Sequence, residues 1–292
     1  MASEALIKAV EQQEVLDRLS DQIQPLVLDA FKAAGPAGRE VKNMLHGTWL
    51  GHPLHPALTD VPIGAWTAAF ALDAMESISG RKEFGSGADV AIGVGLVGAA
   101  GAAVTGLTDW SETYGGARKV GMLHGLLNVG ATALYATSLV LRRKKNRRAG
   151  VGFAMLGYAV SSAAAYLGGH LVFGEQVGVN HAAAQEMPKE FVAVMAEGEL
   201  AEGQMKRVDA AGVPVLLVRC EGEVCAIAHT CSHMGGPLSE GTLEGDLVQC
   251  PWHGSRFNVH DGSVVDGPAT FPQPRFETRV QNGQIEVRSI DR

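Results

Sequence analysis

The sequence predicts a membrane α-helical bundle of four transmembrane helices, followed by an all-β domain. Four long hydrophobic segments lie between residues 57 and 173, whereas short alternating runs fill much of the last hundred residues. A chain of 292 residues has the length of about two domains. Its net charge of −7 argues against a nucleic-acid-binding protein.

Residues 1–45 are expected to form an N-terminal helical segment. Charged residues recur throughout it, so it lacks the continuous apolar core of a signal peptide. Its apolar residues are loosely spaced for one helix face, and Pro25 is expected to interrupt the helix. They are Leu6, Val10, Leu16, Leu19 and Ile23. This face suits an amphipathic helix on a membrane surface or a helix packed against another one.

The predicted transmembrane domain covers residues 46–173. Its hydrophobic segments lie near residues 57–79, 88–108, 120–141 and 150–173. The last three carry almost no charge and are long enough to cross the ~30 Å hydrocarbon layer at ~1.5 Å per residue. The first contains Asp60, Asp73 and Glu76, so its assignment is weaker. The alternative is a soluble four-helix bundle, but its helices would need polar faces that segments two to four lack.

A basic loop between the third and fourth segments sets the expected orientation. It runs from Arg142 to Arg148 and carries six positive charges, which favour the cytoplasmic side. We therefore expect a multi-pass protein of the cell (inner) membrane with an extracytoplasmic β domain. The residues around Arg147-Arg148 also resemble a twin-arginine export signal, which would explain how a folded domain crosses the membrane. The alternative is an ordinary positive-inside loop.

Residues 174–190 are predicted to be a linker, because Gly174, Gly178 and Pro188 break regular structure. Residues 191–292 carry short β-type runs joined by turn pairs such as Asn282-Gly283. The runs are Val213–Arg219, Val224–His229, Leu247–Gln249 and Ile285–Arg288.

Cys220 and Cys225 flank one of the predicted turns in this domain. They form either a redox-labile disulfide or a pair of strand residues that act as small buried hydrophobes. The cysteine count therefore does not fix the cellular compartment.

Two short motifs in the β domain point to a metal centre. Cys231-Ser232-His233 and Cys250-Pro251-Trp252-His253 each supply one thiolate and one imidazole. Iron and zinc accept both ligand types, so the ligands alone leave the metal open. The set suits a structural Cys2His2 zinc site. It also suits a [2Fe–2S] centre in which two Cys hold one iron and two His hold the other.

Longer stretches around both motifs carry a resemblance. They are Cys231–Leu238, Cys250–Phe257 and the loop Gly267-Pro268-Ala269. With them, residues from about 190 to 290 resemble the Rieske family. The resemblance implies a [2Fe–2S] cluster in which Cys231 and Cys250 ligate the inner iron and His233 and His253 the outer iron. It also implies that Ser255 hydrogen-bonds a cluster sulfur and that the Gly267-Pro268 loop covers the cluster.

Two departures from the family bear on the reduction potential. Rieske proteins of cytochrome bc complexes have two further Cys that form a disulfide, and this chain has none at those positions. Phe257 lies where those proteins usually have a Tyr that supports a cysteine sulfur. Because hydrogen bonds to cluster sulfurs raise the potential, we expect a value in the lower half of the ~−150 to +300 mV Rieske range.

Four motifs in the first part of the chain carry a second resemblance. They are His52-Pro53-Leu54-His55-Pro56, Gly106–Trp110, His124–Asn128 and Gly168–Val172. Over about residues 45–181 they resemble a bacterial four-helix membrane domain of unknown function. Members of that family occur fused to a Rieske domain.

In an up-and-down bundle, His55, His124 and His170 fall at the same end, together with Asp109. Polar groups gathered at one depth of a membrane bundle are costly and usually functional. Three interpretations stay open. His124 and either His55 or His170 are axial ligands of a haem b, the residues line a quinone pocket, or they make helix-end hydrogen bonds without a cofactor.

These patterns predict a membrane-anchored electron-transfer protein rather than an enzyme in its own right. It would pass single electrons between a redox enzyme, or a haem in the bundle, and the respiratory quinone or cytochrome pool. Its partners would be a redox protein or respiratory complex and the lipid bilayer, with a quinone under the second interpretation of the histidines. The alternatives are a quinol-oxidising oxidoreductase subunit and a redox or iron sensor.

Overall fold

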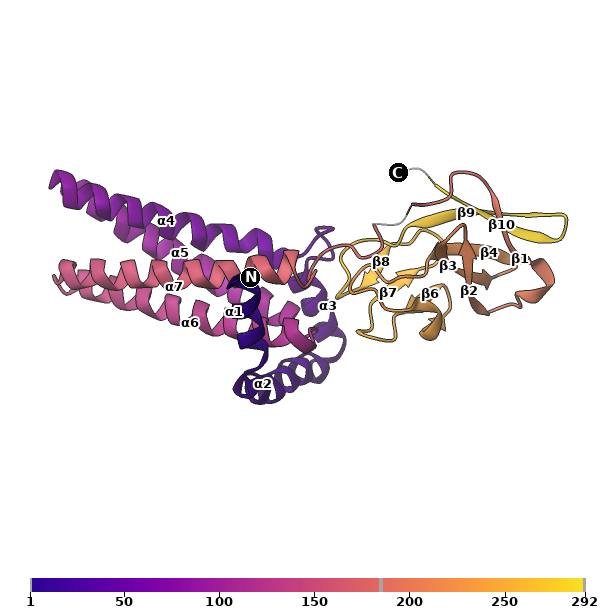
Figure 1. Cartoon of the computed structure of the whole chain (residues 1–292), viewed down its shortest axis with the longest axis horizontal. Helices are drawn as coiled ribbons and strands as arrows, with labels where there is room; N and C mark the ends of the chain where they lie inside the picture. Colours follow the sequence, from indigo (N-terminus) through magenta and orange to yellow (C-terminus); the bar gives the residue numbers. More distant parts are fainter. Residues whose placement is uncertain (1, 184–185, 291–292) are drawn as a thin grey trace. The chain divides into compact units, whose positions relative to one another are not determined.

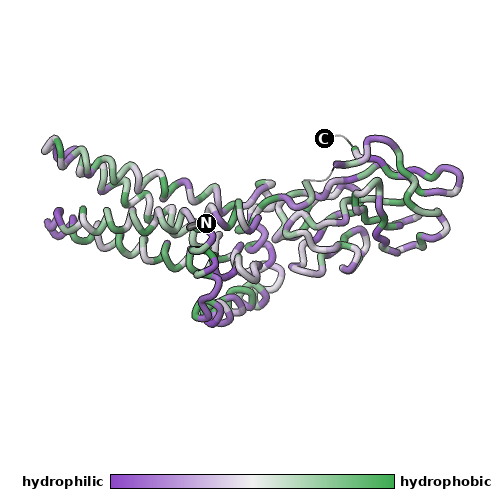
Figure 2. Tube along the Cα trace, in the orientation of Figure 1, coloured by the Kyte–Doolittle hydropathy of each residue, from purple (hydrophilic) through white to green (hydrophobic). Residues whose placement is uncertain are grey.

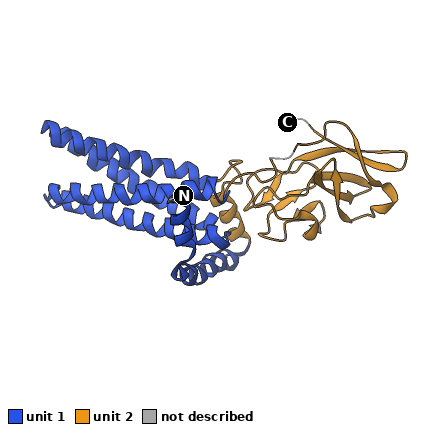
Figure 3. Cartoon of the chain, viewed as in Figure 1, with its two compact units in different colours: residues 1–35, 54–177 blue, residues 36–53, 178–292 orange. Residues whose placement is uncertain are grey.

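The computed structural model describes residues 2–183 and 186–290. Contacts divide the chain into two compact units, which Figure 3 colours separately. We call residues 1–35 and 54–177 the helical unit, and residues 36–53 and 178–292 the β unit. Residues 36–53 thus precede the long helices in the sequence but belong to the β unit.

The described part of the helical unit contains four long helices, as the hydrophobic segments predict (Figure 1). They are α4 (Leu54–Ser79), α5 (Lys82–Trp110), α6 (Gly115–Arg143) and α7 (Arg147–Phe173). Short connections reverse the chain, so α4 packs along α5 and α6 packs along α7 as two helical hairpins. The connections contain left-handed residues, Gly80 (φ 71°) and Lys145 (φ 63°), a conformation that commonly ends helices.

A buried aromatic pair joins the two hairpins. The rings of Trp66 on α4 and Tyr135 on α6 stack with centroids 4.2 Å apart. Gly95 on α5 makes room for them, because a Cβ at this position would overlap the indole nitrogen of Trp66. Small residues on one helix therefore allow large side chains of another to fill the interior.

Apolar side chains also face outward from the long helices, and Figure 2 shows hydrophobic residues along their length. Ile78, Val97 and Phe173 are 88%, 77% and 89% exposed. Large apolar surfaces of this kind mark contact with a partner or a membrane. In the part of the chain that the structure describes, α5, α6 and α7 are long and apolar enough to cross a membrane. The α4 helix contains three acidic residues and does not meet the same measure.

Two of the acids of α4 pair with arginines beside the α6–α7 turn. Arg142 Nη1 donates to Asp73 Oδ1 (2.8 Å) and to Asp89 Oδ1 of α5 (2.9 Å). Arg147 pairs with Glu76 and with Asp89. Asp73 is only 4% exposed, so its ionised form depends on these partners. The exposed positive charge of this basic loop therefore comes from Arg143, Lys144, Lys145 and Arg148.

The N-terminal helices α1 (Ala2–Glu11) and α2 (Glu14–Ala33) pack against α6. Ile7, Val10 and Leu16 are buried in an apolar cluster with side chains of the long helices. The apolar face of this segment thus packs against other helices, which is the second of the two interpretations that the sequence left open.

The prediction that Pro25 interrupts the N-terminal helix is wrong, because α2 continues through it to Ala33. A proline inside a helix removes one backbone hydrogen bond and costs ~3 kcal/mol. Tertiary contacts offset this cost. The amide of the neighbouring Gln24 is buried and donates to the carbonyl oxygens of Trp110 (3.1 Å) and Thr113 (2.9 Å).

Within residues 186–290, the strands form two antiparallel sheets with the orders β1-β10-β9-β4-β3-β2 and β5-β6-β7-β8 (Figure 1). Their bounds are β1 (Val192–Ala196), β2 (Met205–Ala210), β3 (Val213–Cys220), β4 (Glu223–Ala228), β5 (Thr242–Glu244), β6 (Leu247–Gln249), β7 (Arg256–Asn258), β8 (Val264–Asp266), β9 (Arg275–Gln281) and β10 (Gln284–Ser289). The four predicted runs are confirmed as β3, β4, β6 and β10. The predicted turn Asn282-Gly283 has positive φ at both residues (52° and 74°), as a two-residue hairpin turn requires.

Strand β3 sends alternate side chains into two apolar cores. Leu216 and Val218 belong to a core that also contains Cys231 and Cys250. Leu217, between them, belongs to the core on the other face of the sheet. Successive side chains of β3 thus point to opposite faces of the sheet, and both faces are buried. Strand β3 therefore lies at the centre of the β unit, and the two cysteines lie in one of its two cores.

Candidate metal centre

Two loops with the same backbone geometry carry the Cys and His motifs. In the first loop, the N–H of Cys231 donates to the carbonyl of Gly236 (2.8 Å), and the N–H of Gly235 donates back to the carbonyl of Cys231 (2.9 Å). The second loop repeats both bonds at the same spacing around Cys250, with lengths of 2.8 and 3.1 Å. Each loop is therefore a closed turn that starts from a cysteine.

Glycines allow these turns and bring them close together. Gly235 (φ 77°) and Gly254 (φ 76°), each four residues after a cysteine, adopt left-handed backbone that other residues rarely accept. A Cβ on Gly236 would lie 2.8 Å from the Sγ of Cys250. The first loop therefore approaches the sulfur of the second more closely than a side chain would permit.

The four candidate ligands lie in two pairs, one of histidines and one of cysteines. The rings of His233 and His253 have centroids 4.9 Å apart and are nearly perpendicular (88°). The buried thiols of Cys231 and Cys250 hydrogen-bond each other, which raises the pKa of Cys231 and lowers that of Cys250 to about 7. The N–H groups of Trp252 and His253 also donate to Cys250 and favour its thiolate.

The donor atoms fit an iron–sulfur cluster. The Nδ1 of His233 is buried and has no hydrogen-bond partner among the described residues. An unpaired buried nitrogen is costly, and ligation of a metal removes that cost. Burial, followed by the nearby His253, holds the pKa of His233 well below its usual value, so the ring is neutral as a metal ligand must be.

The loop of residues 267–271 is attached to both motif loops through buried serines. Ser255 Oγ accepts the N–H of Ala269 (3.0 Å). Ser232 Oγ donates to the carbonyl of Phe271 (2.7 Å). One serine belongs to each motif loop, so the 267–271 loop is fixed to both.

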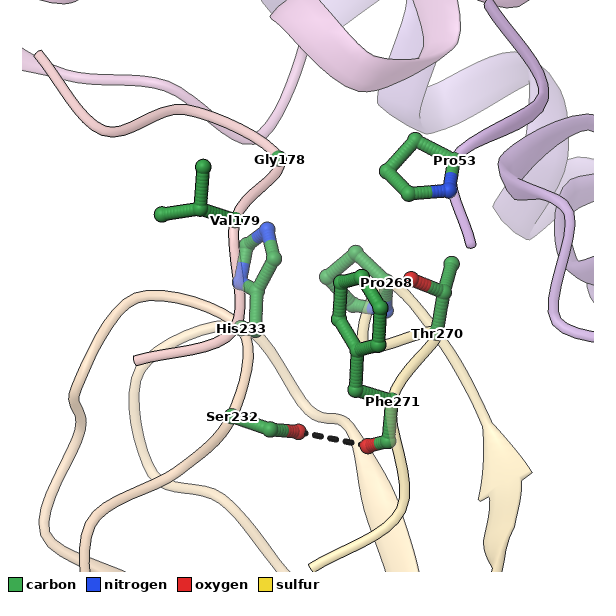
Figure 4. A pocket seen from close by; sticks show the side chains of 8 residues that line it. All are labelled: Pro53, Gly178, Val179, Ser232, His233, Pro268, Thr270 and Phe271. Atoms are coloured by element: carbon green, nitrogen blue, oxygen red, sulfur yellow. Dashed lines mark hydrogen bonds between the residues drawn. The ribbon is translucent and has the colours of Figure 1, made fainter. Parts of the chain in front are cut away.

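The ring of His233 lines a small pocket, which Figure 4 shows from close by. Its walls come from three separate parts of the β unit: the 267–271 loop, Pro53, and the pair Gly178 and Val179. Pro53 and Val179 lie outside the stretch that resembles the Rieske family. Residues outside the Rieske region therefore help to enclose one imidazole.

Helix α3 (Gly35–His46) holds the same loop at its start. The amide nitrogen of Asn43 donates to Asp266 Oδ1 (2.9 Å), and its side-chain oxygen accepts the N–H of Gly267 (2.9 Å). A Cβ on Gly267 would lie 3.1 Å from the Cγ2 of Thr48. This contact was not predicted from the sequence, because Asn43 and Asp266 are 223 positions apart and no motif marks them.

Cys220 and Cys225 are free, buried thiols on the neighbouring strands β3 and β4, as the strand-residue interpretation predicts. Burial raises the pKa of Cys225 to about 11. Only the thiolate reacts with alkylating reagents, and at pH 8 a thiol of this pKa is ionised in roughly one molecule per thousand. We expect mass spectrometry to find Cys225 unmodified in native protein at pH 8 and modified after denaturation, with reactivity rising as the pH approaches 11. Rapid modification in the folded chain would contradict this assignment.

Of the three candidate histidines of the bundle, two lie near each other. His55 on α4 and His124 on α6 have ring centroids 6.3 Å apart. His170 lies beside Glu175 instead, with 3.4 Å between its Nε2 and the carboxylate oxygen.

Comparison with known families matches residues 190–277 to the Rieske [2Fe-2S] domain. The chain is 38% identical to ferredoxin CarAc of Metapseudomonas resinovorans over 95 residues, which cover 32% of this chain and 89% of that protein. The chain belongs to the Rieske [2Fe–2S] family. It is also 35% identical to the ferredoxin component of biphenyl 2,3-dioxygenase of Rhodococcus jostii (strain RHA1) over 94 residues, or 32% of this chain and 88% of that protein.

The apoptosis-inducing factor 3 proteins of mouse and human share the Rieske region. They are 36% and 37% identical to this chain over 91 residues, which cover 31% of this chain but only 15% of those proteins. Residues 51–181 match a second family, described as a predicted membrane protein (DUF2231). Both resemblances expected from the sequence are thus found. A Rieske domain implies a [2Fe–2S] cluster and electron transfer, and it follows a helical region with apolar helices.

Proposed function

We propose that the chain is a membrane-anchored Rieske electron carrier. Cys231 and Cys250 would hold the inner iron, and His233 and His253 the outer iron. One observation carries the proposal: two equivalent closed loops each carry one thiol and one imidazole, and they pair the two thiols with each other and the two imidazoles with each other. When bound, the cluster takes up or releases one electron at a time. The protein supplies the ligands, the N–H groups that donate to the sulfurs, and the apolar surroundings.

We infer that a redox protein docks on the His253 side of the centre. The ring of His233 lines a pocket walled by the chain's own Pro53 and Val179. Trp252, directly before His253, is 49% exposed. An oxygenase component is one partner class, because the chain is similar to a dioxygenase ferredoxin component. The respiratory quinone or cytochrome pool is the other, because the chain also carries a membrane domain.

Reduction by a quinol analogue separates these partner classes. Fast reduction of the cluster by the quinol would support contact with the quinone pool, or the alternative of a quinol-oxidising oxidoreductase subunit. A cluster that no carrier cycles quickly would support the redox or iron sensor. The relatives give no support for a haem b in the helical bundle. The hypothesis of a bundle haem therefore rests on the geometry of the bundle histidines alone.

We further propose that all four long helices, in a domain of residues 46–173, span the cell (inner) membrane. The Rieske domain, residues 191–292, would follow a linker of residues 174–190 and lie on the extracytoplasmic side. Pairing of Asp73 and Glu76 of α4 with Arg142 and Arg147 supports a span by α4, because it lowers the cost of burying these two charges. The exposed cations at the α6–α7 turn favour the cytoplasm.

Metal analysis and electron paramagnetic resonance of the detergent-purified full chain test the cluster. We expect about two irons per chain and a Rieske-type signal after reduction. Cys231→Ser should abolish the signal, because it removes one of two ligands of the inner iron. Cys220→Ser is the matched control, since Cys220 is buried in the same apolar core but lies outside the motif loops. One zinc per chain, or a signal that survives Cys231→Ser, would refute the proposal.

A further inference from the structure

We propose that His55 and His124 form a second metal centre, in the helical unit, which binds the iron of a haem through two axial imidazoles. The two residues come from different helical hairpins, α4–α5 and α6–α7. The site lies outside the Rieske motifs and goes beyond the cluster-based electron transfer proposed above.

The hydrogen bonds of both rings leave the same nitrogen as ligand. The Nδ1 of His55 lies 2.9 Å from the carbonyl oxygen of Ala102, and the Nδ1 of His124 lies 2.8 Å from that of Ala164. A carbonyl only accepts, so each Nδ1 carries the proton and each neutral ring keeps its lone pair on Nε2. Histidines that bind metals commonly donate their other ring N–H to a backbone carbonyl in this way, which fixes the tautomer and orients the ring.

The amide of Asn128 agrees with this tautomer. Its Nδ2 lies 3.1 Å from the Nε2 of His124, and an amide N–H needs an unprotonated acceptor. The same Nδ2 also donates to the backbone carbonyl of His124 (3.0 Å), so it retains a partner when a metal takes the lone pair of the Nε2.

The separation of the rings matches a shared metal. A metal–nitrogen bond of about 2.0–2.1 Å plus about 1.1 Å from the nitrogen to the ring centre gives about 6.3 Å between two imidazoles on opposite sides of one ion. The centroids of His55 and His124 are 6.3 Å apart, with planes at 88°. A quinone head group fits less well, because quinone carbonyls need hydrogen-bond donors and both Nε2 atoms are acceptors in this tautomer.

Two glycines hold the rings at this separation. A Cβ on Gly106 would lie 2.6 Å from the Cε1 of His55, and a Cβ on Gly168 would lie 3.0 Å from the Cε1 of His124. Any larger residue at either position would push its histidine away. Each ring therefore rests on the bare backbone of the partner helix in its own hairpin.

The number of protein ligands selects haem over a bare ion. A structural zinc site takes four protein ligands. Haem iron takes its four equatorial nitrogens from the porphyrin and needs only axial ligands from the protein. The structure favours His55 over His170 as the partner of His124, because the rings of His55 and His124 have centroids 6.3 Å apart, whereas His170 lies beside Glu175.

Haemin titration of the detergent-purified full chain tests the proposal. We expect one haem per chain, with the optical spectrum of six-coordinate low-spin iron. His55→Ala and His124→Ala should each convert the spectrum to five-coordinate iron and weaken haemin binding at least tenfold. Added imidazole should restore the six-coordinate spectrum in both variants, which a purely structural role would not allow. His170→Ala is the control and should bind haemin like the unaltered chain.

Three results would overturn the proposal: no binding of haemin, binding unchanged in both variants, or loss of binding equally in the His170 control. Helical circular dichroism of each variant reports whether the bundle still folds. The Rieske signal is recorded in the same samples. A chain that shows the cluster but binds no haemin would refute this centre and leave the proposed function standing.

Discussion

Replacing Arg142 by alanine is expected to lower the free energy of unfolding of the helical unit by about 3–5 kcal/mol, the usual cost of removing one partner of a buried ion pair. Arg142 binds both carboxylate oxygens of Asp73, which is 4% exposed, and also Asp89. Without it, the cationic partner that remains to the buried carboxylate of Asp73, among the residues that the structure describes, is Arg147, at 3.2 Å. The loss is large because desolvation of a charge is costly whether or not its partner is present. Thermal unfolding in detergent, followed by helical circular dichroism, measures it.

Arg143→Ala is the matched control, since Arg143 is the next residue and is exposed. It should change the unfolding free energy by no more than about 0.5 kcal/mol. Replacing both Arg142 and Asp73 by leucine should recover much of the loss, because an apolar pair of similar volume carries no desolvation cost. Equal losses in Arg142→Ala and Arg143→Ala would show that the pair seen in the structure does not contribute to stability.

The long helices and the cluster motifs were predictable because contiguous residues encode them. A helix of more than 20 residues needs only an unbroken apolar segment, and Cys231 and His233 share one closed loop with its glycine. Of the strands that were missed, β5, β7 and β8 have three residues each, too few for a period of two to stand out. The longer strands β1, β2 and β9 were missed as well, and the three-residue β6 was predicted. Local patterns thus predict the long apolar helices and the buried strands β3 and β4 more completely than the strands with exposed, charged residues, such as β9.

Contacts between distant residues were beyond sequence reasoning. Arg142 looked like part of a solvated basic loop, whereas it pairs with Asp73, 69 positions earlier. Asn43 had no motif, yet it binds the start of the 267–271 loop. Pro25 was expected to interrupt a helix, yet α2 continues through it, beside Gln24, whose amide donates to the distant carbonyls of Trp110 and Thr113. In each case the deciding partner lies far along the chain, where a single sequence holds no information on proximity.

A Ser255→Ala variant is expected to lower the midpoint reduction potential of the cluster. Ser255 is fully buried, and its Oγ accepts the N–H of Ala269, so its own proton is directed elsewhere, as a donor to a cluster sulfur requires. Such a bond stabilises the reduced cluster, which carries more negative charge. A hydrogen bond to a charged group is worth about 1.5–3 kcal/mol. With 59 mV per tenfold change for one electron, this corresponds to a potential lower by about 60–130 mV.

Ser232→Ala separates this effect from the loss of a buried hydroxyl in general. Ser232 is also buried in a motif loop, but its proton already goes to the carbonyl of Phe271. Its removal should loosen the 267–271 loop and shift the potential much less than Ser255→Ala. Phe257→Tyr should raise the potential, if the new hydroxyl reaches a cysteine sulfur from this fully buried position. Redox titration of the three variants therefore distinguishes two causes of a shift in potential, a lost hydrogen bond to sulfur and a change in the packing of the loop. Equal shifts in both serine variants would assign the effect to packing.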